Sequence, residues 1–567
     1  MPFPIFLLSS AFIILAWLVA RALLLPKPIP GIPYSRLSYC MPWGELIGLG
    51  IYTWRTGEVF SWLSMQCLKH KSPLVQLFIP SFSTTHPTLV LADLPEIEDI
   101  VTKRIGEIDR ADLMHTWFGL LVPRATIGFK SKDAHFKQQR RLWNVVLSPT
   151  FLDEVAAPCF AEVANKLAEL WEKKAELADS SFAFEALEDI RHATLDGVWK
   201  MCCATELGLL DAKMSTLRAP AALMVRGHGV VEFAKCKMPK FYDSLGTMLV
   251  CLDWVMQGIS PQMYTWFFRI TGILPRAEKE KDAVLDCCIT QSKSRINGKT
   301  EGLQCALDQV LLKDLQLNKG PIPEDDADRE ATLRDELLEL LITGHETTAS
   351  SIAWALKYLT DNPDVQKRLR ASLQSTFPEA RPSAKEIVTT SIPYLDAVVA
   401  ETLRISATGP VSFRQTLVPC EILGRAIPAG TPIILVTAGP SYERLDMLAV
   451  PLALRSKASQ ATLGRKGNPS LSSQSPRYDL RTFAPERWLV KGQFDPSAVH
   501  MLPFSAGPRG CFGRKIAMLE MRIVLAILVL QLTFPRLSER WSRYGARDGL
   551  TRRPTNCYVS PRPASWK

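Results

Sequence analysis

The chain lacks the cysteine spacing that a zinc site or a disulfide framework needs. It carries 13 cysteines in 567 residues, an odd number, and no two of them form a CxxC pair. Two adjacent doublets occur instead, Cys202-Cys203 and Cys287-Cys288. These features exclude a small disulfide-rich secreted domain. They indicate a reducing compartment, in which most of the thiols are small core residues.

A long basic block is also absent, although the formal net charge is +10. Lys and Arg are scattered among carboxylates, which argues against a nucleic-acid-binding protein. No internal repeat and no Gly/Ser linker divides residues 34–567. Because 47% of the residues are hydrophobic and 22% are charged, the chain has the balance of a folded protein, and residues 34–567 are predicted to form one domain.

One segment of this domain has an unusual composition. Residues 455–479 are rich in Ser, Gly, Lys and Arg and hold few large apolar side chains. This composition is typical of a surface insertion. The charges of the segment are therefore predicted to be solvated.

A long apolar run does occur at the N-terminus. Residues 2–20 carry no charge and approach the roughly 20 residues that a membrane-spanning helix needs. Arg21 and Lys27 follow the run, so the positive-inside rule predicts a single-pass anchor over residues 1–25 with the rest of the chain in the cytosol. The alternative is a cleaved signal peptide, which would carry its basic residues before the run. The Pro-rich residues 26–33 are predicted to form a stiff hinge.

Apolar periodicity predicts a mainly α-helical domain with small β-sheets. Short apolar runs at residues 74–78 and 88–91, bounded by Pro and Ser, predict strands. A 3.6-residue apolar spacing predicts the long helices, which cover residues 160–176, 184–203, 333–361 and 393–405. Asn362-Pro363 should end the third of these helices.

A glycine-rich loop that holds a cysteine is the sharpest chemical motif. A helical run over residues 517–532 follows it. The fixed positions of the motif are Phe504, Gly507, Arg509, Cys511 and Gly513. Small residues let backbone N–H groups approach the sulfur, and a helix N-terminus favours the anionic thiolate that iron binds. A buried cysteine at a helix start is the alternative, but this pattern arises by chance with odds on the order of one in ten thousand.

The segment from Phe504 to Gly513 resembles the heme-binding signature of the cytochrome P-450 family at every signature position. The resemblance implies a mainly α, single-domain cytochrome P-450 fold with small β-sheets, preceded by one N-terminal transmembrane helix. It also implies heme b, with Cys511 as the axial thiolate ligand. The resemblance extends from Pro28 to the C-terminus. Residues 439–479 do not fit it, and they are either a surface insertion or the product of a faulty gene model.

A second motif, from Thr343 to Thr348, is predicted to interrupt its long apolar helix and to open a groove beside it. On its own, such a motif usually contains Thr residues bonded back to their own helix. By the resemblance, it lies in the family's oxygen-binding helix, where Thr347 would hydrogen-bond dioxygen and Glu346 would help to relay protons. Thr343 stands where the family usually has Ala or Gly, so its hydroxyl is expected to face the substrate pocket.

A third set of residues is assigned a structural role by the resemblance. Glu401 and Arg404 lie three residues apart on one predicted helix, and Arg487 follows in a downstream loop. In the family such residues form a buried Glu-Arg cluster. We therefore expect these three side chains to lock the heme cradle in place without taking part in catalysis.

The heme carboxylates need fixed cations, for which the two-pronged guanidinium of Arg is suited. By resemblance these cations are Arg140, Arg414 and Arg509. Phe136 stands four residues before Arg140, where the family usually has a Trp, and Phe136 cannot donate an N–H.

Together these motifs imply a heme-thiolate monooxygenase that inserts one oxygen atom of O2 into a lipophilic small molecule. The general look is similar to microsomal fungal members that tailor secondary metabolites. The expected pocket walls are Trp117, Phe118, Leu120, Leu121 and Phe413. Two other functions stay open. One is a heme-thiolate isomerase or dehydratase, against which the intact Glu346-Thr347 pair argues, and the other is a non-catalytic heme protein.

No GxGxxG motif or flavin-binding region follows the cysteine motif, so the chain is not expected to supply its own electrons. The implied partner is NADPH-cytochrome P-450 reductase, whose acidic surface would dock on the basic side around Arg514, Lys515 and Arg522. The expected location is the endoplasmic reticulum membrane, with the catalytic domain in the cytosol. No nucleic-acid partner is expected.

Overall fold

The computed structural model describes residues 15, 17–19, 21–80, 85–178, 182–218, 223–226, 229–258, 260–298, 304–318, 327–379, 381–439, 450–466 and 479–565. Most of the predicted anchor over residues 1–25 lies outside the described residues. Among those that are described, no helix combines the length and the apolar character that crossing a bilayer requires.

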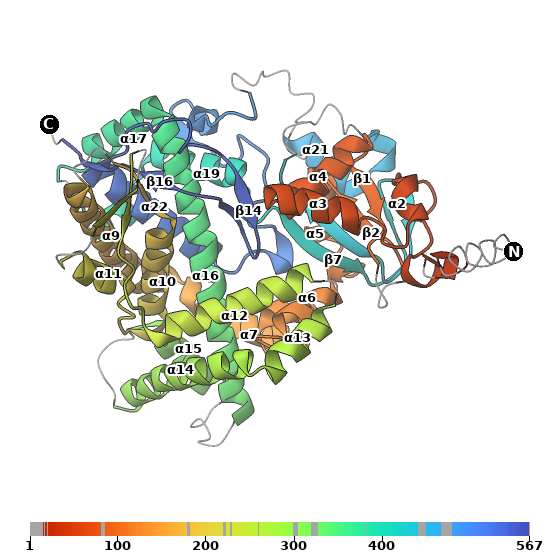
Figure 1. Cartoon of the computed structure of the whole chain (residues 1–567), viewed down its shortest axis with the longest axis horizontal. Helices are drawn as coiled ribbons and strands as arrows, with labels where there is room; N and C mark the ends of the chain where they lie inside the picture. The colour runs from red at the N-terminus through yellow and green to blue at the C-terminus, as the bar shows by residue number, and fades with distance from the viewer. Residues whose placement is uncertain are drawn as a thin grey trace, which may run out of the picture.

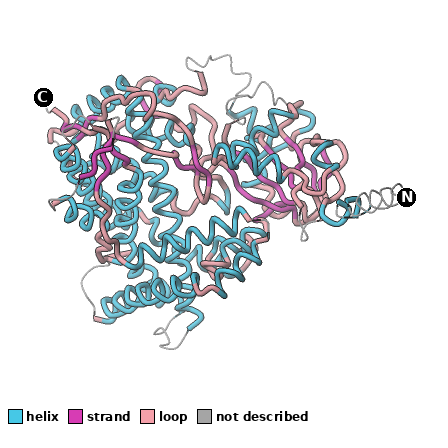
Figure 2. Tube along the Cα trace, viewed as in Figure 1, coloured by secondary structure: helices cyan, strands magenta, loops and turns pink. Residues whose placement is uncertain are grey.

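Helices make up most of the fold, and the strands are short (Figures 1 and 2). The α-helices are α2 (Arg36–Cys40), α3 (Leu46–Thr56), α4 (Val59–Lys69), α5 (Leu94–Thr102), α6 (Asp112–Phe118), α7 (Ala134–Trp143), α8 (Pro149–Phe151), α9 (Ala157–Leu177), α10 (Leu187–Cys203), α11 (Leu209–Leu217), α12 (Lys240–Gln257), α13 (Pro261–Ile270), α14 (Ile273–Asn297), α15 (Ala306–Asn318), α16 (Ala327–Asp361), α17 (Pro363–Thr376), α18 (Ala384–Thr389), α19 (Pro393–Ser406), α21 (Lys457–Lys466) and α22 (Arg514–Gln531). Two short 3-10 helices matter for the site, η1 (Thr126–Gly128) and η6 (Gly507–Arg509).

One five-stranded sheet and several two-stranded sheets complete the fold. The large sheet has the order β1-β2-β10-β7-β3, in which only the β2–β10 pair is parallel. Its strands are β1 (Leu74–Leu77), β2 (Thr88–Leu91), β3 (Ile108–Arg110), β7 (Val411–Thr416) and β10 (Pro432–Val436). The others are β4 (Phe184–Glu185), β5 (Leu223–Arg226), β6 (Val230–Phe233), β8 (Cys420–Ile422), β9 (Arg425–Ile427), β11 (Leu489–Val490), β12 (Gln493–Phe494), β13 (Leu532–Thr533), β14 (Ala546–Asp548), β15 (Arg552–Pro554), β16 (Tyr558–Val559) and β17 (Arg562–Pro563).

The alternation of side chains along the strands explains why the large sheet is covered on both faces. Successive residues of a strand point to opposite faces. Leu89 and Leu91 of β2 pack in a cluster with Ile97 and Ile100 of α5. Val90, between them, packs in a second cluster with side chains of α4. Strands buried on both faces appear in a sequence as continuous apolar runs, which is how these strands were predicted.

The predicted strands and long helices are confirmed, with one correction. The interval 184–203 was predicted as one helix, but its first two residues form strand β4 and α10 begins only at Leu187. Strand β4 pairs with β16, near the end of the chain. Local periodicity cannot detect a partner so distant in the sequence.

The long helix α16 runs through the helical part of the molecule and contacts α10, α19 and α22 (Figure 1). Side chains from α9, α10, α16 and α22 share the main hydrophobic core. Burial of these apolar faces, at roughly 25 cal/mol per Å², stabilises the helical part and fixes α16 in place.

The Pro-rich residues 26–33 pack on the sheet. Gln76 of β1 is fully buried, and its side chain accepts a hydrogen bond from Ile29 N at 2.8 Å. Its Nε2 donates to Ile29 O at 2.9 Å and to Ile32 O at 2.7 Å. The stretch is non-helical, and these bonds tie it to the domain.

In the described part of the unusual residues 455–479, one charged side chain is buried in an ion pair. Arg455 donates to both carboxylate oxygens of Asp93, at 2.6 and 2.7 Å, and both side chains are buried. Ser456 donates to Asp99 at 2.8 Å. Helix α21 thereby packs against α5, and the prediction that every charge of residues 455–479 is merely solvated is wrong for Arg455.

Candidate active site

A cavity of about 370 Å³ lies where α7, α16, the end of α19 and the loop before α22 meet. Cys511 is the only cysteine among the described residues that line it. Thr347 lines it from α16 and Arg140 from α7. Segments that are far apart in the sequence therefore come together around the Cys511 sulfur.

The loop that holds Cys511 is fixed by its own backbone and by α5. Cys511 N donates to Phe504 O at 2.8 Å, and Gly510 N donates to Gly507 O at 2.9 Å. Gly507 has φ +67°, and a Cβ there would lie 2.0 Å from Val101 O of α5. Only glycine fits this position.

The accessible surface of Cys511 faces the cavity. Burial raises the pKa of this thiol, while the N–H groups of Gly513 and Arg514 and the charge of Arg140 oppose the rise. The helix α22 begins three residues after the sulfur. A Cβ at Gly513 would meet no atom within 4 Å, because this glycine borders the open cavity.

One wall of the cavity offers buried donors that have no acceptor among the described residues. These atoms are Nε of Arg110, Nε1 of Trp143, and Nε and Nη1 of Arg509. Burial and the charge of Arg414 lower the pKa of Arg509 to about 10. An anionic ligand would satisfy these donors, since unpaired buried polar groups are costly. Sequence reasoning missed Arg110 and Trp143.

Arg140 and Phe136 contact different parts of the cysteine loop, which the sequence did not indicate. Nη2 of Arg140 donates to Gly510 O at 2.9 Å and to Pro508 O at 3.3 Å, so it braces the cysteine loop. The Phe136 ring lies beneath the guanidinium of Arg509, with 4.1 Å between the ring centroid and Cζ. Trp143 lies on the same face of α7 as Phe136, two turns later, and it brings an indole N–H to the cavity.

Arg414 does not line the cavity. Its residue is buried in β7, opposite Arg110 of β3, and its Nη1 donates to Phe413 O at 3.0 Å. Burial lowers the pKa of Arg414 to about 10. Arg110, its cross-strand neighbour, is the arginine of this pair that reaches the cavity wall.

The expected pocket walls are wrong. None of those five apolar residues lines the cavity, and they belong to the hydrophobic core or pack against it. Trp117 and Phe413 form an edge-to-face pair with centroids 5.0 Å apart. Apolar side chains serve core packing as well as ligand contact, and the sequence alone does not distinguish the two.

The helix α16 is not interrupted at the Thr343–Thr348 motif, contrary to the prediction. The hydroxyls bond back to carbonyls one turn earlier: Thr347 Oγ1 to Thr343 O at 2.8 Å, and Thr343 Oγ1 to Glu339 O at 2.7 Å. The backbone ladder therefore persists. Gly344 lets α10 approach, since a Cβ there would lie 3.3 Å from Val198.

Glu346 is buried next to the cavity but does not line it. Its Oε1 forms an ion pair with Nη2 of Arg191 on α10, and His345 Nε2 lies 3.6 Å away. Burial alone would raise the pKa of Glu346, but the contact with His345 and the charges of Arg191 and Arg553 lower it to about 2. Sequence reasoning missed Arg191, because no local motif links the two helices.

Two further carboxyl groups of α16 line the cavity and were also missed. Glu336 Oε1 accepts from Thr126 N at 2.9 Å, and Glu339 Oε2 accepts from Ile127 N at 3.1 Å. Burial and the charge of Glu339 raise the pKa of Glu336 to about 9. Burial also raises the pKa of Glu339, against the charges of nearby arginines. The pair holds η1 against α16.

The structure brings Glu401, Arg404 and Arg487 together in one buried cluster. Glu401 Oε1 accepts from Arg404 Nη2, Arg487 Nε and Ala484 N, each at 2.9 Å. Its Oε2 accepts from Arg404 Nε and from Trp488 Nε1, both at 2.9 Å. Both carboxylate oxygens are therefore hydrogen-bonded, as a buried charge requires. Trp488 is a donor that sequence reasoning missed.

The residues of the cavity fit a heme. Heme offers an iron and two carboxylates. The cavity offers the Cys511 sulfur to the iron. It offers the unpaired donors of Arg110, Trp143 and Arg509 to the carboxylates. The fold and the cavity thus define a mainly helical protein built to hold an anionic cofactor beside a cysteine sulfur.

Comparison with known proteins identifies the family. A model of the family described as Cytochrome P450 matches residues 61–442 and 481–560. The chain therefore belongs to the cytochrome P450 family and is a cytochrome P450 monooxygenase. The unmatched interval between the two matched parts nearly coincides with the unusual residues 439–479.

Similar proteins cover almost the whole chain. The chain is 30% identical to cytochrome P450 monooxygenase GME11363 of Pestalotiopsis microspora, over 97% of each chain. It is 28% identical to cytochrome P450 monooxygenase TRI13 of Fusarium sporotrichioides, over 98% of each. Cytochrome P450 4V2 of Homo sapiens is 24% identical over 85% of this chain and 81% of its own.

Proposed function

We propose that this chain inserts one oxygen atom from O2 into a lipophilic small molecule, with Cys511 as the thiolate ligand of its heme. The observation that carries the proposal is one cavity that joins the Cys511 sulfur to the unpaired donors of Arg110, Trp143 and Arg509. When bound, a heme-thiolate supplies reductive activation of dioxygen. The protein must then bind substrate, exclude water and deliver protons.

Thr347 Oγ1 is the hydroxyl placed for the proton-handling role. It donates its own hydrogen to Thr343 O and keeps lone pairs that can accept a second hydrogen bond. Glu346, the adjacent carboxylate, is held by Arg191 away from the cavity wall. Glu346 must give up this ion pair before it can carry a proton to Thr347, so Arg191 acts as a positioning residue.

Replacing Thr347 with Ala should uncouple NADPH use from product formation. We expect the product formed per NADPH to fall by roughly tenfold or more, because the hydroxyl that handles the proton is lost. Product, peroxide and NADPH are measured together in reconstituted membranes. Thr360→Ala, on the same helix and outside the cavity, is the control. If the product formed per NADPH were unchanged in Thr347→Ala, the Thr347 hydroxyl would serve only to hydrogen-bond its own helix.

A secondary metabolite is the substrate class we propose. The similar fungal monooxygenases support it, and so do Leu340, Leu403 and Val411, which line the cavity. Affinity should rise with the apolar surface of the ligand, as burial of that surface contributes roughly 25 cal/mol per Å². The shift of the heme absorbance on ligand binding measures affinity. An affinity independent of ligand apolarity would contradict this class.

NADPH-cytochrome P450 reductase is the electron donor we propose. Arg514 and Lys515 are exposed beside the cysteine loop and can meet an acidic partner. Arg522 does not belong to this surface, because it pairs with Asp396 and donates to Ile387 O. In the assay described for Thr347, NADPH oxidation should require the reductase, and turnover with NADPH alone would rule this partner out.

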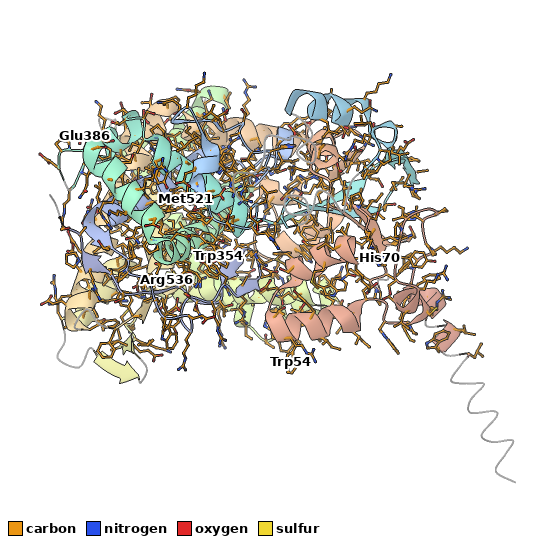
Figure 3. The ribbon with its side chains drawn as sticks, turned by 90° about the horizontal axis from the view of Figure 1, so that it is seen from above. Trp54, His70, Trp354, Glu386, Met521 and Arg536 are labelled. Atoms are coloured by element: carbon orange, nitrogen blue, oxygen red, sulfur yellow. The ribbon has the colours of Figure 1, made fainter. Side chains whose placement is uncertain are left out.

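We also propose that the protein is held at the endoplasmic reticulum membrane by residues 1–25, with the domain in the cytosol. Exposed apolar side chains support a membrane-facing surface. Trp54 of α3 is 85% exposed and projects outward (Figure 3). On α12 and α13, Trp254 and Trp266 are 56% and 64% exposed.

The full chain should remain with microsomes after alkaline extraction, and protease added to intact microsomes should digest the domain. Release by alkali would contradict the anchor, and protection from protease would contradict the cytosolic orientation.

A further inference from the structure

The segment around Arg455 binds one helix, α5, at two points. Helix α21 lies outside the two intervals that the family model matches, yet it packs against α5 in the part of the molecule that holds the large sheet (Figure 1). Arg455, two residues before α21, pairs with both carboxylate oxygens of Asp93, and the exposed fractions of the two side chains are only 7% and 6%. Ser456 Oγ donates to Asp99 Oδ2 at 2.8 Å. This part of the unusual segment therefore belongs to the folded domain.

Asp93 has a second task, because it is the N-cap of α5. Its Oδ1 accepts a hydrogen bond from Glu96 N at 3.0 Å, which satisfies a backbone donor of the first turn. The same oxygen accepts the 2.6 Å bond from Arg455 Nη1. Arg455 therefore fixes the orientation of the carboxylate with which α5 begins. Without Arg455, this buried carboxylate would lose its counter-ion.

The other end of α5 contacts the loop that holds Cys511. A Cβ at Gly507 would lie 2.0 Å from Val101 O, so the two backbones touch with no side chain between them. Leu502 and Ala506, in the same stretch of chain as Gly507, pack in the cluster that contains the apolar face of α5. Because α5 has only nine residues, its two ends are about 14 Å apart. A shift at its N-cap is therefore expected to move the cysteine loop.

We propose that Arg455 is a positioning residue for the cysteine ligand. Acting through Asp93 and α5, it holds the turn at Gly507, and with it the Cys511 sulfur, in the place from which the sulfur binds iron. This proposal rests on the proposed function, in which Cys511 is the thiolate ligand of a heme. Arg140 supports the same loop by direct hydrogen bonds to its carbonyls, whereas Arg455 acts through a helix.

The first measurement is amide hydrogen exchange of the full, heme-loaded chain, followed by mass spectrometry of its peptides. Cys511 N donates within the loop and Lys103 N closes the last turn of α5, so these amides report local opening. In Arg455→Met, exchange in α5 and in residues 501–513 should rise roughly tenfold, because a buried carboxylate is left without its counter-ion. Peptides of α9, in the main helical core, should be unchanged. An equal rise in every peptide, or no rise in α5 and the loop, would overturn the proposal.

The second measurement follows the thiolate itself. In Arg455→Met, the reduced carbon-monoxide band near about 450 nm should convert to the band near about 420 nm roughly tenfold faster than in the unaltered protein. Faster exchange with an unchanged rate of conversion would show that Arg455 supports the loop without positioning the sulfur, and would overturn the assigned role. If the unaltered protein lacked the band near about 450 nm, the proposed function would fail instead. Hydrogen exchange would then still decide whether Arg455 holds the loop.

Matched variants separate the ion pair from the N-cap. Asp93→Asn keeps an N-cap acceptor and removes only the charge, so its exchange should resemble that of Arg455→Met. The double variant that combines Asp93→Asn with Arg455→Met should be no worse than either single variant, because the two side chains act as one pair. Effects that add up in the double variant would overturn the pairing.

Two further variants complete the set. Arg455→Lys keeps the charge but not the two-pronged guanidinium, so it should recover part of the protection that Arg455→Met loses. It also provides the measurement if Arg455→Met fails to fold. Lys457→Met removes an exposed cation of α21 and is the control, which should leave both readouts unchanged.

Discussion

Cys511→Ala is expected to abolish both thiolate ligation and monooxygenation. The reduced carbon-monoxide complex should lose its absorbance band near about 450 nm, which the family's thiolate ligation gives. No other cysteine lines the cavity in the part of the chain that the structure describes, so no second thiolate can replace it. Product formation should fall to background, since the oxygen chemistry depends on the electron-rich sulfur ligand.

Two companion variants make this result specific. Cys511→Ser keeps the size of the side chain but removes the sulfur, and its band should move toward about 420 nm. Cys40→Ala removes an exposed thiol far from the loop in sequence and should leave the spectrum unchanged. An active Cys511→Ala protein with the band still near about 450 nm would eliminate Cys511 as the ligand.

The part of the site that sequence reasoning predicts is the part encoded locally. Phe504, Gly507, Cys511 and Gly513 act through one short loop, and their spacing reflects its geometry. Gly507, for example, has a positive φ and packs against the backbone of α5. Such constraints fix residue types at fixed distances in the chain, so they can be read from the sequence.

The residues that sequence reasoning missed act across elements. Arg191 pairs with Glu346 from another helix. Trp143 brings to the cavity an indole N–H that Phe136 cannot provide. Arg110 reaches the cavity wall, although its strand neighbour Arg414 was the predicted contact. Each of these relations depends on how α7, α10, β3 and α16 pack, and no periodicity or spacing records that packing.

The fold, like the site, divides into elements with local sequence patterns and contacts between elements that such patterns do not record. The strands β1 and β2 and the long helices have strong local patterns and were predicted. The position of α21 on α5 depends on a buried ion pair between Arg455 and Asp93. The composition of residues 455–479 had instead predicted that the charge of Arg455 is solvated. Because α5 also contacts η6, this unusual segment supports the loop that holds Cys511.

Glu401→Ala should prevent stable folding of the heme cradle. Glu401 is fully buried and accepts five hydrogen bonds, three of them from Arg404 and Arg487 and the others from Ala484 and Trp488. Its loss leaves two guanidinium groups buried without their counter-ion. Breaking a buried pair in this way costs about 3–5 kcal/mol, and the total stability of a domain is only about 5–15 kcal/mol. We expect a lower melting temperature and a carbon-monoxide band displaced toward about 420 nm.

Glu401→Gln separates charge from shape. Whichever oxygen the amide NH2 replaces, it would place a donor against donors, because Oε2 accepts from Arg404 and Trp488 and Oε1 accepts from Arg404, Arg487 and Ala484. We therefore expect Glu401→Gln to be strongly destabilised, although its volume is unchanged. Glu379→Ala, at an exposed position between α17 and α18, is the control and should melt almost as the unaltered protein does. If Glu401→Ala and Glu401→Gln both kept the normal melting temperature and spectrum, the cluster would not be the lock that its geometry indicates.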